Sequence, residues 1–196
     1  MARLLYFKEI QNSNLLRLGI SEGEESAAYT VRATVYADIG MPTRGSEISE
    51  GAMELVRAED EYIRCKKRAL YLLSIADNNE KSLISKLRAK GFAYEVASEV
   101  CREMVSLGYI NEDIQLERIV QREANEHLLG ARRIVAKLAS KGYSLSRIKA
   151  AIERLTASGE VNFSANAIAL LERKLPPDAT EEDRLCLLEK YGFRKS

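Results

Sequence analysis

The spacing of hydrophobic residues changes near position 50, from short alternating runs to a helical period. Residues 4–11, 14–20 and 28–35 alternate loosely and are rich in Val, Ile, Thr and Tyr, which is typical of strands. Residues 40–49 contain Pro42 and Gly45 and predict a loop. We therefore expect a small antiparallel sheet, with residues 22–25 at the tip of a hairpin, followed by a helical region.

Capping residues delimit the expected helices. Asn79, Asn111 and Asn162 each suit an N-cap, where a side-chain oxygen accepts from free backbone amides. Thr180 and Asp183 form a partial capping box. The helices are expected at residues 50–75, with a break near 57–60 left open, and then at 79–91, 93–106, 111–128, 130–141, 144–157, 162–175 and from 180 onward. The apolar stripe expected in the helix at 93–106 consists of Val96, Val100, Met104 and the following Leu107.

A step of about 51 residues recurs across the helical region. Gly91-Phe92 returns as Gly142-Tyr143 after 51 residues and as Gly192-Phe193 after a further 50. A second marker, at residues 108–111, returns at the same step at residues 159–162. Two markers with one spacing predict a duplicated supersecondary unit, and such repeats more often form binding surfaces than enzyme pockets.

The predicted fold is mainly α, with tandem three-helix repeats in an elongated array after a small antiparallel β N-terminal region. We expect the β-rich region at residues 1–48, a first helical repeat at 49–110, a second at 111–161 and a truncated third at 162–196. The third repeat lacks its last helix, unless the final few residues are its remnant.

Composition limits the class of protein. Of the 196 residues, 46% are hydrophobic and 30% are charged, which is typical of one or two soluble globular domains. No run approaches the ~18 apolar residues of a membrane span, and no signal-peptide pattern is present, so we expect a cytoplasmic protein with no membrane partner. Cys65, Cys101 and Cys186 are odd in number and widely spaced, which favours free thiols.

The net charge of +1 hides an uneven distribution of charged residues. Residues 1–60 hold six basic and ten acidic side chains, whereas residues 61–162 hold eighteen and thirteen. Residues 127–152 contain six basic residues and no acidic one. We predict that these six form a surface for DNA phosphates or for an acidic groove of a protein, with a plain solvated face as the alternative. They are Arg132, Arg133, Lys137, Lys141, Arg147 and Lys149. Arg133, Lys137 and Lys141 are spaced to share one helical face, while Ile134 and Leu138 point elsewhere.

Motifs for catalysis or cofactor binding do not occur in the sequence. His127 is the only histidine, and HExxH, GxxxxGK[ST] and GxGxxG are all missing. We therefore expect no catalytic residue, no metal and no cofactor. The aromatic residues after the repeated glycines are interpreted as packing groups that close the helix caps, with base stacking as the alternative.

Four motifs follow one another in the helical region: YLL at 71–73, NEKSLISKLRAKGF at 79–92, LGYINED at 107–113 and LLGARRIVAKLASKGYS at 128–144. In their order and spacing they resemble the RecX family, which regulates the bacterial RecA recombinase. The β-rich leader and AEDEY at 58–62 resemble the longer version of that family, so the likeness covers nearly the whole chain. The sequence departs from the family pattern after LGY. Family members often have two acidic residues and a phenylalanine there, whereas this chain has Asn-Glu at 111–112 and Gln-Leu at 115–116.

The resemblance implies a regulator without catalytic activity that is built from tandem three-helix repeats. It implies binding to RecA and to its filament on single-stranded DNA, and mostly inhibition of recombination, of the ATPase and of the SOS response. We expect a monomer whose contact surface is the six basic residues named above. Direct contacts to DNA phosphates are left open.

Two other functions stay open at this point. One is a stand-alone tri-helical DNA-binding module that acts as a transcriptional regulator. Its recognition helix at 144–157 would offer only Arg147, Lys149 and Arg154, which suit phosphates better than base edges. The other is a plain helical scaffold without a role in nucleic-acid metabolism.

Overall fold

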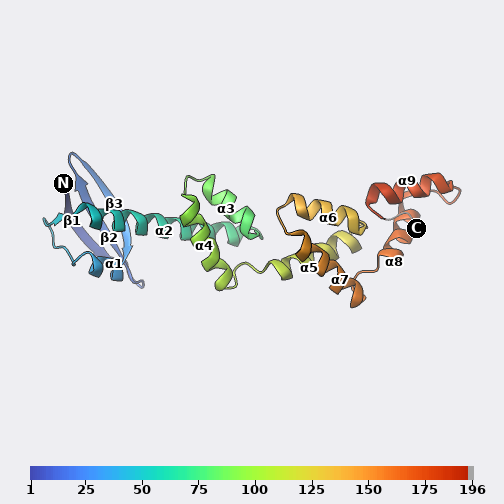
Figure 1. Cartoon of the computed structure of the whole chain (residues 1–196), viewed down its shortest axis with the longest axis horizontal. Coiled ribbons are helices and arrows are strands. Elements are labelled where there is room, and N and C mark those ends of the chain that lie inside the picture. Colours follow the sequence, from blue (N-terminus) through green and yellow to red (C-terminus); the bar gives the residue numbers. More distant parts are fainter. Residues whose placement is uncertain (194–196) are drawn as a thin grey trace. The chain divides into compact units, whose positions relative to one another are not determined.

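A computed structural model describes residues 1–193 of the chain (Figure 1). The chain divides into two compact units. The first contains Met1–Ala76 and Leu83–Ser106, and the second contains Asp77–Ser82 and the chain from Leu107 onward.

The first unit begins with a four-stranded antiparallel sheet. Its strands are β1 (Ala2–Glu9), β2 (Leu15–Glu22), β3 (Glu25–Arg32) and β4 (Glu47–Ile48), in the spatial order β3-β2-β1-β4. Gly23, at a φ of +69°, makes the tight turn between β2 and β3, because a glycine adopts this left-handed conformation at low cost. The predicted sheet and the hairpin tip at residues 22–25 are confirmed.

Two helices cover one face of this sheet. They are α1 (Ala33–Asp38) and α2 (Glu50–Ile75). Leu4, Leu18 and Ile20 of the sheet are fully buried against Met53 and Val56 of α2, so alternate strand positions and one stripe of the helix form a single core. Ser49 caps α2 by accepting from the amide of Ala52.

Helix α2 also protects the exposed edge of strand β3. The amide of Thr30 donates to Asp60 at 2.8 Å, and the side chain of Arg32 pairs with Glu59. An unpaired strand edge is a template for unwanted pairing, and carboxylates that occupy its amides block it. The sequence leaves a break near 57–60 open, but α2 is continuous there, and the two acids of this segment serve the strand edge.

Three further expectations were wrong in detail. The strand expected at 28–35 ends at Arg32, because β2 begins at Leu15 and offers no partner beyond it; the chain then turns into α1, which packs Val35 against the sheet. The loop expected at 40–49 contains β4, which pairs with β1. Leu107, placed in an apolar stripe, is 56% exposed.

The rest of the first unit is helical and packs on the second half of α2. Its helices are α3 (Glu80–Arg88), whose first residues belong to the second unit, and α4 (Tyr94–Ser106). Val100 and Met104 are fully buried, as the periodicity predicts. Glu103 of α4 accepts hydrogen bonds from Tyr62 at 2.6 Å and from Lys66 at 2.7 Å, which ties α4 to α2.

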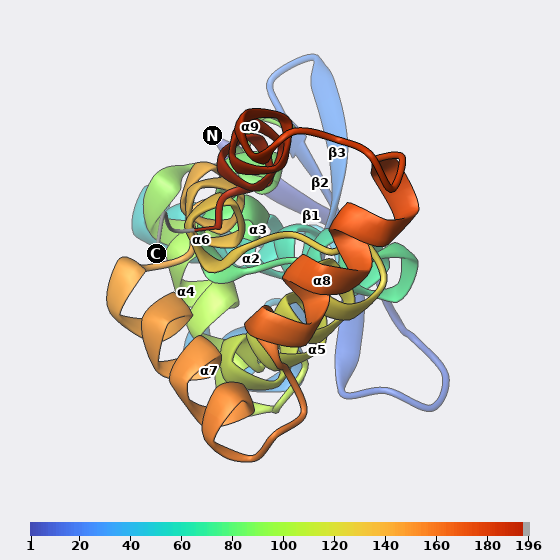
Figure 2. The same cartoon turned by 90° about the vertical axis from the view of Figure 1, so that its right-hand side faces the viewer.

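The second unit contains five helices in its described residues (Figure 2). They are α5 (Glu112–Asn125), α6 (Ala131–Ser140), α7 (Leu145–Ala157), α8 (Phe163–Lys174) and α9 (Glu181–Tyr191). Helices α5, α6 and α7 enclose a core that includes Leu116, Ile134, Leu138 and Ile148. A smaller cluster of Leu128, Leu170 and Phe193 joins α8 and the end of α9 to it.

Residues 77–82 contact the rest of the second unit through polar groups. The side-chain amide of Asn79 donates to the carbonyl of Lys141 at 2.9 Å, and the amide of Glu80 donates to Glu112 at 3.0 Å. Arg118 pairs with Asp77 at 2.9 Å. Asn79 also caps α3 as predicted, by accepting from the amide of Ser82 at 2.7 Å.

The repeated sequence markers make the same backbone contacts each time. The amides of Phe92, Tyr143 and Phe193 all donate to a leucine carbonyl five residues earlier, at 3.4, 3.2 and 2.9 Å. The glycine before each aromatic has a φ between +87° and +95°, which is the geometry of a Schellman cap. Asn111 and Asn162 cap α5 and α8, and Thr180 with Asp183 forms a full capping box, all as predicted.

The end of α5 differs from its prediction. Helix α5 stops at Asn125 rather than near residue 128, because Leu128 adopts a φ of +53° and turns its side chain into the cluster with Leu170 and Phe193. The residue limits expected for the repeats stay a prediction, and the final part of the expected C-terminal remnant, residues 194–196, lies outside the described residues. Within residues 1–193 no helix is both long and apolar enough to cross a membrane.

Candidate interface for an acidic partner

Helix α6 and its C-cap, Lys141, carry the three basic residues that were expected to share one helical face. Ile134 and Leu138 are fully buried in the core of the second unit, so this side of α6 faces inward. Arg133, Lys137 and Lys141 are all exposed. The sequence pattern therefore separated the basic stripe of α6 correctly from its apolar stripe.

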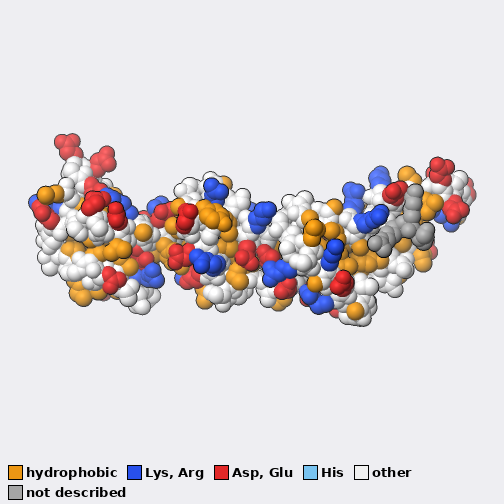
Figure 3. All heavy atoms as spheres, viewed as in Figure 1, with side chains coloured by type: hydrophobic (Ala, Val, Ile, Leu, Met, Phe, Trp, Pro, Cys, Tyr) orange, Lys and Arg blue, Asp and Glu red, His pale blue; other side chains and the backbone are white. Residues whose placement is uncertain are grey.

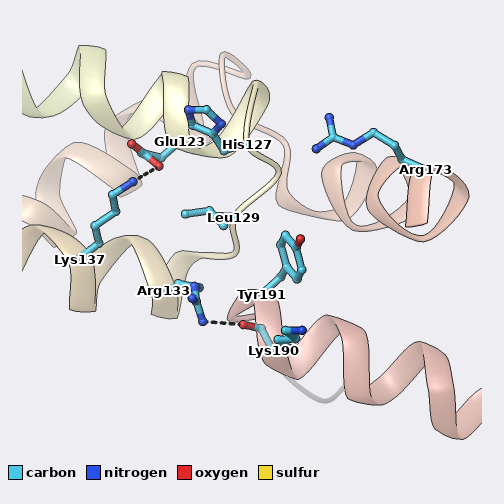
Figure 4. Close-up of a pocket in the computed structure, with 8 residues that line it drawn as sticks. All are labelled: Glu123, His127, Leu129, Arg133, Lys137, Arg173, Lys190 and Tyr191. Atoms are coloured by element: carbon cyan, nitrogen blue, oxygen red, sulfur yellow. Dashed lines mark hydrogen bonds and ion pairs between the residues drawn. The ribbon is translucent and has the colours of Figure 1, made fainter. Parts of the chain in front are cut away.

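Arg133 and Lys137 line a hollow of about 560 Å³ on the second unit. Figure 4 shows the other groups around it: Glu123 and His127 from α5 and the segment after it, Arg173 from α8, and the end of α9. The full lining consists of Glu123, His127, Leu129, Arg133, Lys137, Arg173, Lys190 and Tyr191. Lys and Arg side chains also gather beside α6 and α9 on the surface in Figure 3.

The lining of this hollow is strongly positive. Four of its residues are cations, and Glu123 is its only carboxylate. Within residues 1–193, neither Arg173 nor Lys190 forms an ion pair, so their charge is not neutralised locally. A concave surface lined with one sign of charge concentrates the field and attracts ligands of the opposite sign.

Glu123 is the buried centre of the hollow, with a residue exposure of 2%. Lys137 donates to it at 2.6 Å, and Arg122 lies 3.6 Å away. Burial raises the pKa of Glu123, but the hydrogen bond from Lys137 and the charges of Lys137, His127 and Arg122 outweigh that effect, and the pKa is lowered below 4.5. The carboxylate is therefore charged at neutral pH, and it neutralises much of the charge of Lys137.

Arg133 links α6 to the end of α9. Its guanidinium donates to the carbonyl of Lys190 at 2.9 Å. Nearby, the amide of Gly130 donates to the carbonyl of Tyr191 at 2.9 Å, and the amide of Arg132 donates to that of Gly192 at 3.2 Å. Helix α6 has no side-chain N-cap, so these carbonyls of α9 occupy amides that would otherwise be free at its first turn.

Arg132 and Lys149 lie at a different place from Arg133 and Lys137. They line a second hollow of about 580 Å³, together with the largely apolar groups Ala131, Val135, Phe163, Gly192 and Phe193. The six predicted residues thus do not form one continuous surface around one hollow. Consecutive positions of α6 point in directions about 100° apart, so Arg132 and Arg133 open onto separate depressions.

Arg147 and Lys141, the remaining two predicted residues, line neither hollow. Arg147 pairs with Glu112 at 2.7 Å and with Asp113 at 3.5 Å, so two carboxylates neutralise it. Lys141 is exposed, and within residues 1–193 its side chain forms no ion pair.

The absence of acidic residues between positions 127 and 152 does not make this region free of carboxylates in space. Helix α5 supplies Glu112 to Arg147 and Glu123 to Lys137. These two cations are therefore paired with groups of an earlier helix, although no acidic residue is near them in the sequence.

Sequence reasoning missed Arg173, Lys190, His127 and Tyr191 as lining residues. Arg173 and Lys190 stand in a segment whose charges balance, and nothing local distinguishes them from other surface cations. Only the packing of α8 and of the end of α9 near α6 brings them to the hollow. His127 has no metal or triad partner near it in the sequence, so nothing there marks it as part of a site.

Comparison with known proteins identifies the family. No family model matches the chain. The curated regulatory protein RecX of Clostridioides difficile (strain 630) is 30% identical over 149 residues, which are 76% of this chain and 68% of that protein. This chain belongs to the RecX family. RecX relatives are named regulatory proteins, and this membership supports a regulatory role for the chain.

Solved RecX structures share the fold. A crystal structure of regulatory protein RecX superposes with a TM-score of 0.71 at 18% identity, over 99% of this chain and 95% of the other. RecX from Lactobacillus salivarius superposes with a TM-score of 0.58 at 22% identity, over 69% and 90%. The predicted mainly α fold with a small antiparallel N-terminal sheet is confirmed.

Proposed function

We propose that this RecX-family protein binds RecA and its filament on single-stranded DNA, and that it modulates the recombinase, mostly by inhibition. This inhibition would lower the rates of ATP hydrolysis and strand exchange by RecA, and it would lower the SOS signalling that depends on the filament. In this proposal the protein acts in the cytoplasm as a monomer, without catalysis of its own. Membership of a family of regulatory proteins supports the proposal.

The observation that carries the proposal is the positive hollow between α5, α6, α8 and α9. Four cations surround one buried carboxylate there, and two of them, Arg173 and Lys190, have no carboxylate partner in residues 1–193. Such a site suits an acidic loop of a protein partner or phosphates held within a filament. Of the six basic residues predicted from the sequence, Arg133 and Lys137 belong to this hollow, and Arg173 and Lys190 are added to them.

The alternative of a stand-alone DNA-binding module finds less support. Its recognition helix would be α7, whose basic side chains are Arg147, Lys149 and Arg154. Arg147 pairs with Glu112, and Arg154 pairs with Glu117 at 2.8 Å. Two of the three cations are therefore turned to α5 rather than free for a major groove, which leaves Lys149.

The proposal is tested with full-length protein and RecA on single-stranded DNA. Wild-type protein is expected to lower the rate of ATP hydrolysis and of strand exchange. Reversing the charge of Arg173 and Lys190 to Glu should weaken this effect about tenfold or more, because like charges opposite an acidic surface cost at least ~1.4 kcal/mol. These two side chains form no ion pair within residues 1–193, so their replacement breaks no salt bridge in that part of the chain.

The matched control reverses Lys8 and Lys174, which are exposed and line neither of the two hollows on the second unit. It changes the net charge by the same amount and should inhibit like the wild type. The proposed function would be contradicted if saturating wild-type protein left the rates of both reactions unchanged. Equal inhibition by both double variants would leave the function standing and remove the hollow as its surface.

A further inference from the structure

A second basic hollow lies on the first unit and is lined by none of the six basic residues predicted from the sequence. It has a volume of about 510 Å³ and is lined by residues of α2 and of the turn after α3. The lining residues are Arg64, Lys67, Arg68, Tyr71, Lys90 and Phe92. Four cations and two aromatic rings thus meet with no carboxylate in the lining.

Most of the positive charge of this hollow is not neutralised. Arg64 pairs with Asp60 at 2.8 Å, whereas Lys67, Arg68 and Lys90 form no ion pair within residues 1–193. The neighbouring Lys66 shows the contrast, because it points to α4 and pairs with Glu103. Lys66 therefore serves the fold, whereas three of the four cations of the hollow remain available to a ligand.

The guanidinium of Arg68 lies over the ring of Tyr71 in this hollow. The guanidinium carbon of Arg68 lies 5.0 Å from the centre of the Tyr71 ring, and the ring residue is 53% exposed. The Nε of Arg68 is buried and has no hydrogen-bond partner. A buried donor without a partner is costly, and this one belongs to a side chain that lines the hollow.

Phe92 departs from the role of its counterparts in the repeat. Tyr143 and Phe193 are buried at 7% and 8% exposure and belong to apolar clusters of the second unit. Phe92 makes the same backbone contact to Leu87 but is only partly buried and lines the basic hollow. Tyr143 and Phe193 are buried because they close helix caps. Phe92 closes a cap too, but part of its ring stays accessible to a ligand in the hollow.

We infer that this hollow binds single-stranded nucleic acid, with a base against Tyr71 or Phe92 and adjoining phosphates against Lys67, Arg68 and Lys90. An exposed ring and a partly buried one beside cations without ion pairs suit a strand that offers both π-faces and phosphates. A duplex keeps its bases stacked and offers only its phosphates to such a site. An acidic peptide would use the cations but not the rings. The inference requires neither RecA nor the hollow on the second unit.

The test uses the full-length protein alone, without RecA. A fluorescent oligothymidine and a hairpin duplex of equal charge are titrated by anisotropy at several salt concentrations. Tyr71→Ala should weaken binding of the single strand about tenfold and leave the duplex nearly unchanged, whereas Tyr71→Phe should bind like the wild type. Lys67→Gln with Lys90→Gln should flatten the slope of log affinity against log salt by about 0.7 for each phosphate that the variant no longer binds.

Arg88→Ala is the matched control, because Arg88 is an exposed arginine of α3 that also lies over a tyrosine, Tyr94, but does not line the hollow. It should bind like the wild type. Oligothymidine that carries 5-iodouracil should crosslink to Tyr71 or Phe92, as located by mass spectrometry. Circular dichroism shows whether Tyr71→Ala folds. If it does not, Lys67→Gln and Lys90→Gln still test the hollow, because both lysine side chains are exposed.

Three results would overturn the inference. The first is that Tyr71→Ala folds and binds the oligothymidine as tightly as the wild type. The second is that the duplex binds as well as the single strand, or that crosslinks map only outside the hollow. The third is that polyglutamate displaces the oligothymidine, and that the lysine variants bind polyglutamate more weakly than the wild type whereas Tyr71→Ala does not. This result would identify an acidic peptide as the ligand. None of these results bears on inhibition of RecA, which is measured separately.

Discussion

The backbone of Gly192, at the end of α9, packs directly against Gly130, at the start of α6. A β-carbon at position 130 would overlap the carbonyl group of Gly192, and one at position 192 would overlap Arg133. Two hydrogen bonds accompany the contact, from the amide of Gly130 to Tyr191 and from that of Arg132 to Gly192. This junction holds Lys190 and Tyr191 at the positive hollow.

Gly130→Ala is expected to destabilise the second unit by about 1–3 kcal/mol, because the new methyl group pushes α9 away from α6. The midpoint of urea unfolding measures this change, and limited proteolysis should show faster cleavage in α9. Gly51→Ala is the control, since Gly51 lies within α2 and a β-carbon there meets nothing within 4 Å. It should stabilise the chain by up to ~1 kcal/mol. Unchanged unfolding of Gly130→Ala would show that the junction relaxes freely.

Lys137→Met should destabilise the protein by about 1–3 kcal/mol at neutral pH. It removes the closest cation from the buried Glu123 and leaves Arg122 at 3.6 Å, and a buried carboxylate without its hydrogen-bonded partner is costly. Adding Glu123→Gln to this variant should recover part of the loss, because the amide carries no charge. Equilibrium unfolding of the four proteins in the cycle gives the coupling energy. A coupling near zero would mean that solvent screens the pair, since the Lys137 side chain is 41% exposed.

The same pair predicts a pH dependence of stability. The pKa of Glu123 in the folded chain lies below its ordinary value of 4.5, so its contribution to stability is fully present above that value. It is lost as the pH falls through the folded pKa, because the unfolded chain then binds the proton more readily. Thermal unfolding between pH 7 and pH 3 should therefore show a smaller acid loss for Glu123→Gln than for the wild type. Parallel curves for the two proteins would contradict the assignment.

The three cysteines should differ sharply in reactivity. Cys186 is exposed, whereas Cys65 and Cys101 are buried, and burial raises the pKa of the Cys65 thiol to about 11. The thiolate is the reactive form, so a thiol reagent such as DTNB should titrate Cys186 quickly and the other two only on unfolding. Cys186→Ser should abolish the fast phase and leave the slow phase intact. A fast phase of more than one thiol would show that α2 or α4 opens in the native state.

Much of the fold was predictable because its signals are local. Asn79, Asn111 and Asn162 cap helices through their own side chains, and the glycines of the 51-residue step end helices through a left-handed φ that few other residues adopt. Each of these contacts joins residues a few positions apart, so the sequence alone is enough to place it. The turn into α1 after Arg32 could not be placed in this way, because it depends on where the partner strand begins.

The sequence by itself determined the repeat, the helix caps, the separation of basic and apolar stripes on α6, and the family. Tertiary structure alone decided which cations are available. It turned Arg147 to Glu112, turned Lys137 to Glu123, and brought Arg173 and Lys190 to the hollow. The physical reason is that a charge interacts through space rather than along the chain: residues 127–152 contain no acid, yet the carboxylates of α5 lie within hydrogen-bonding distance of them.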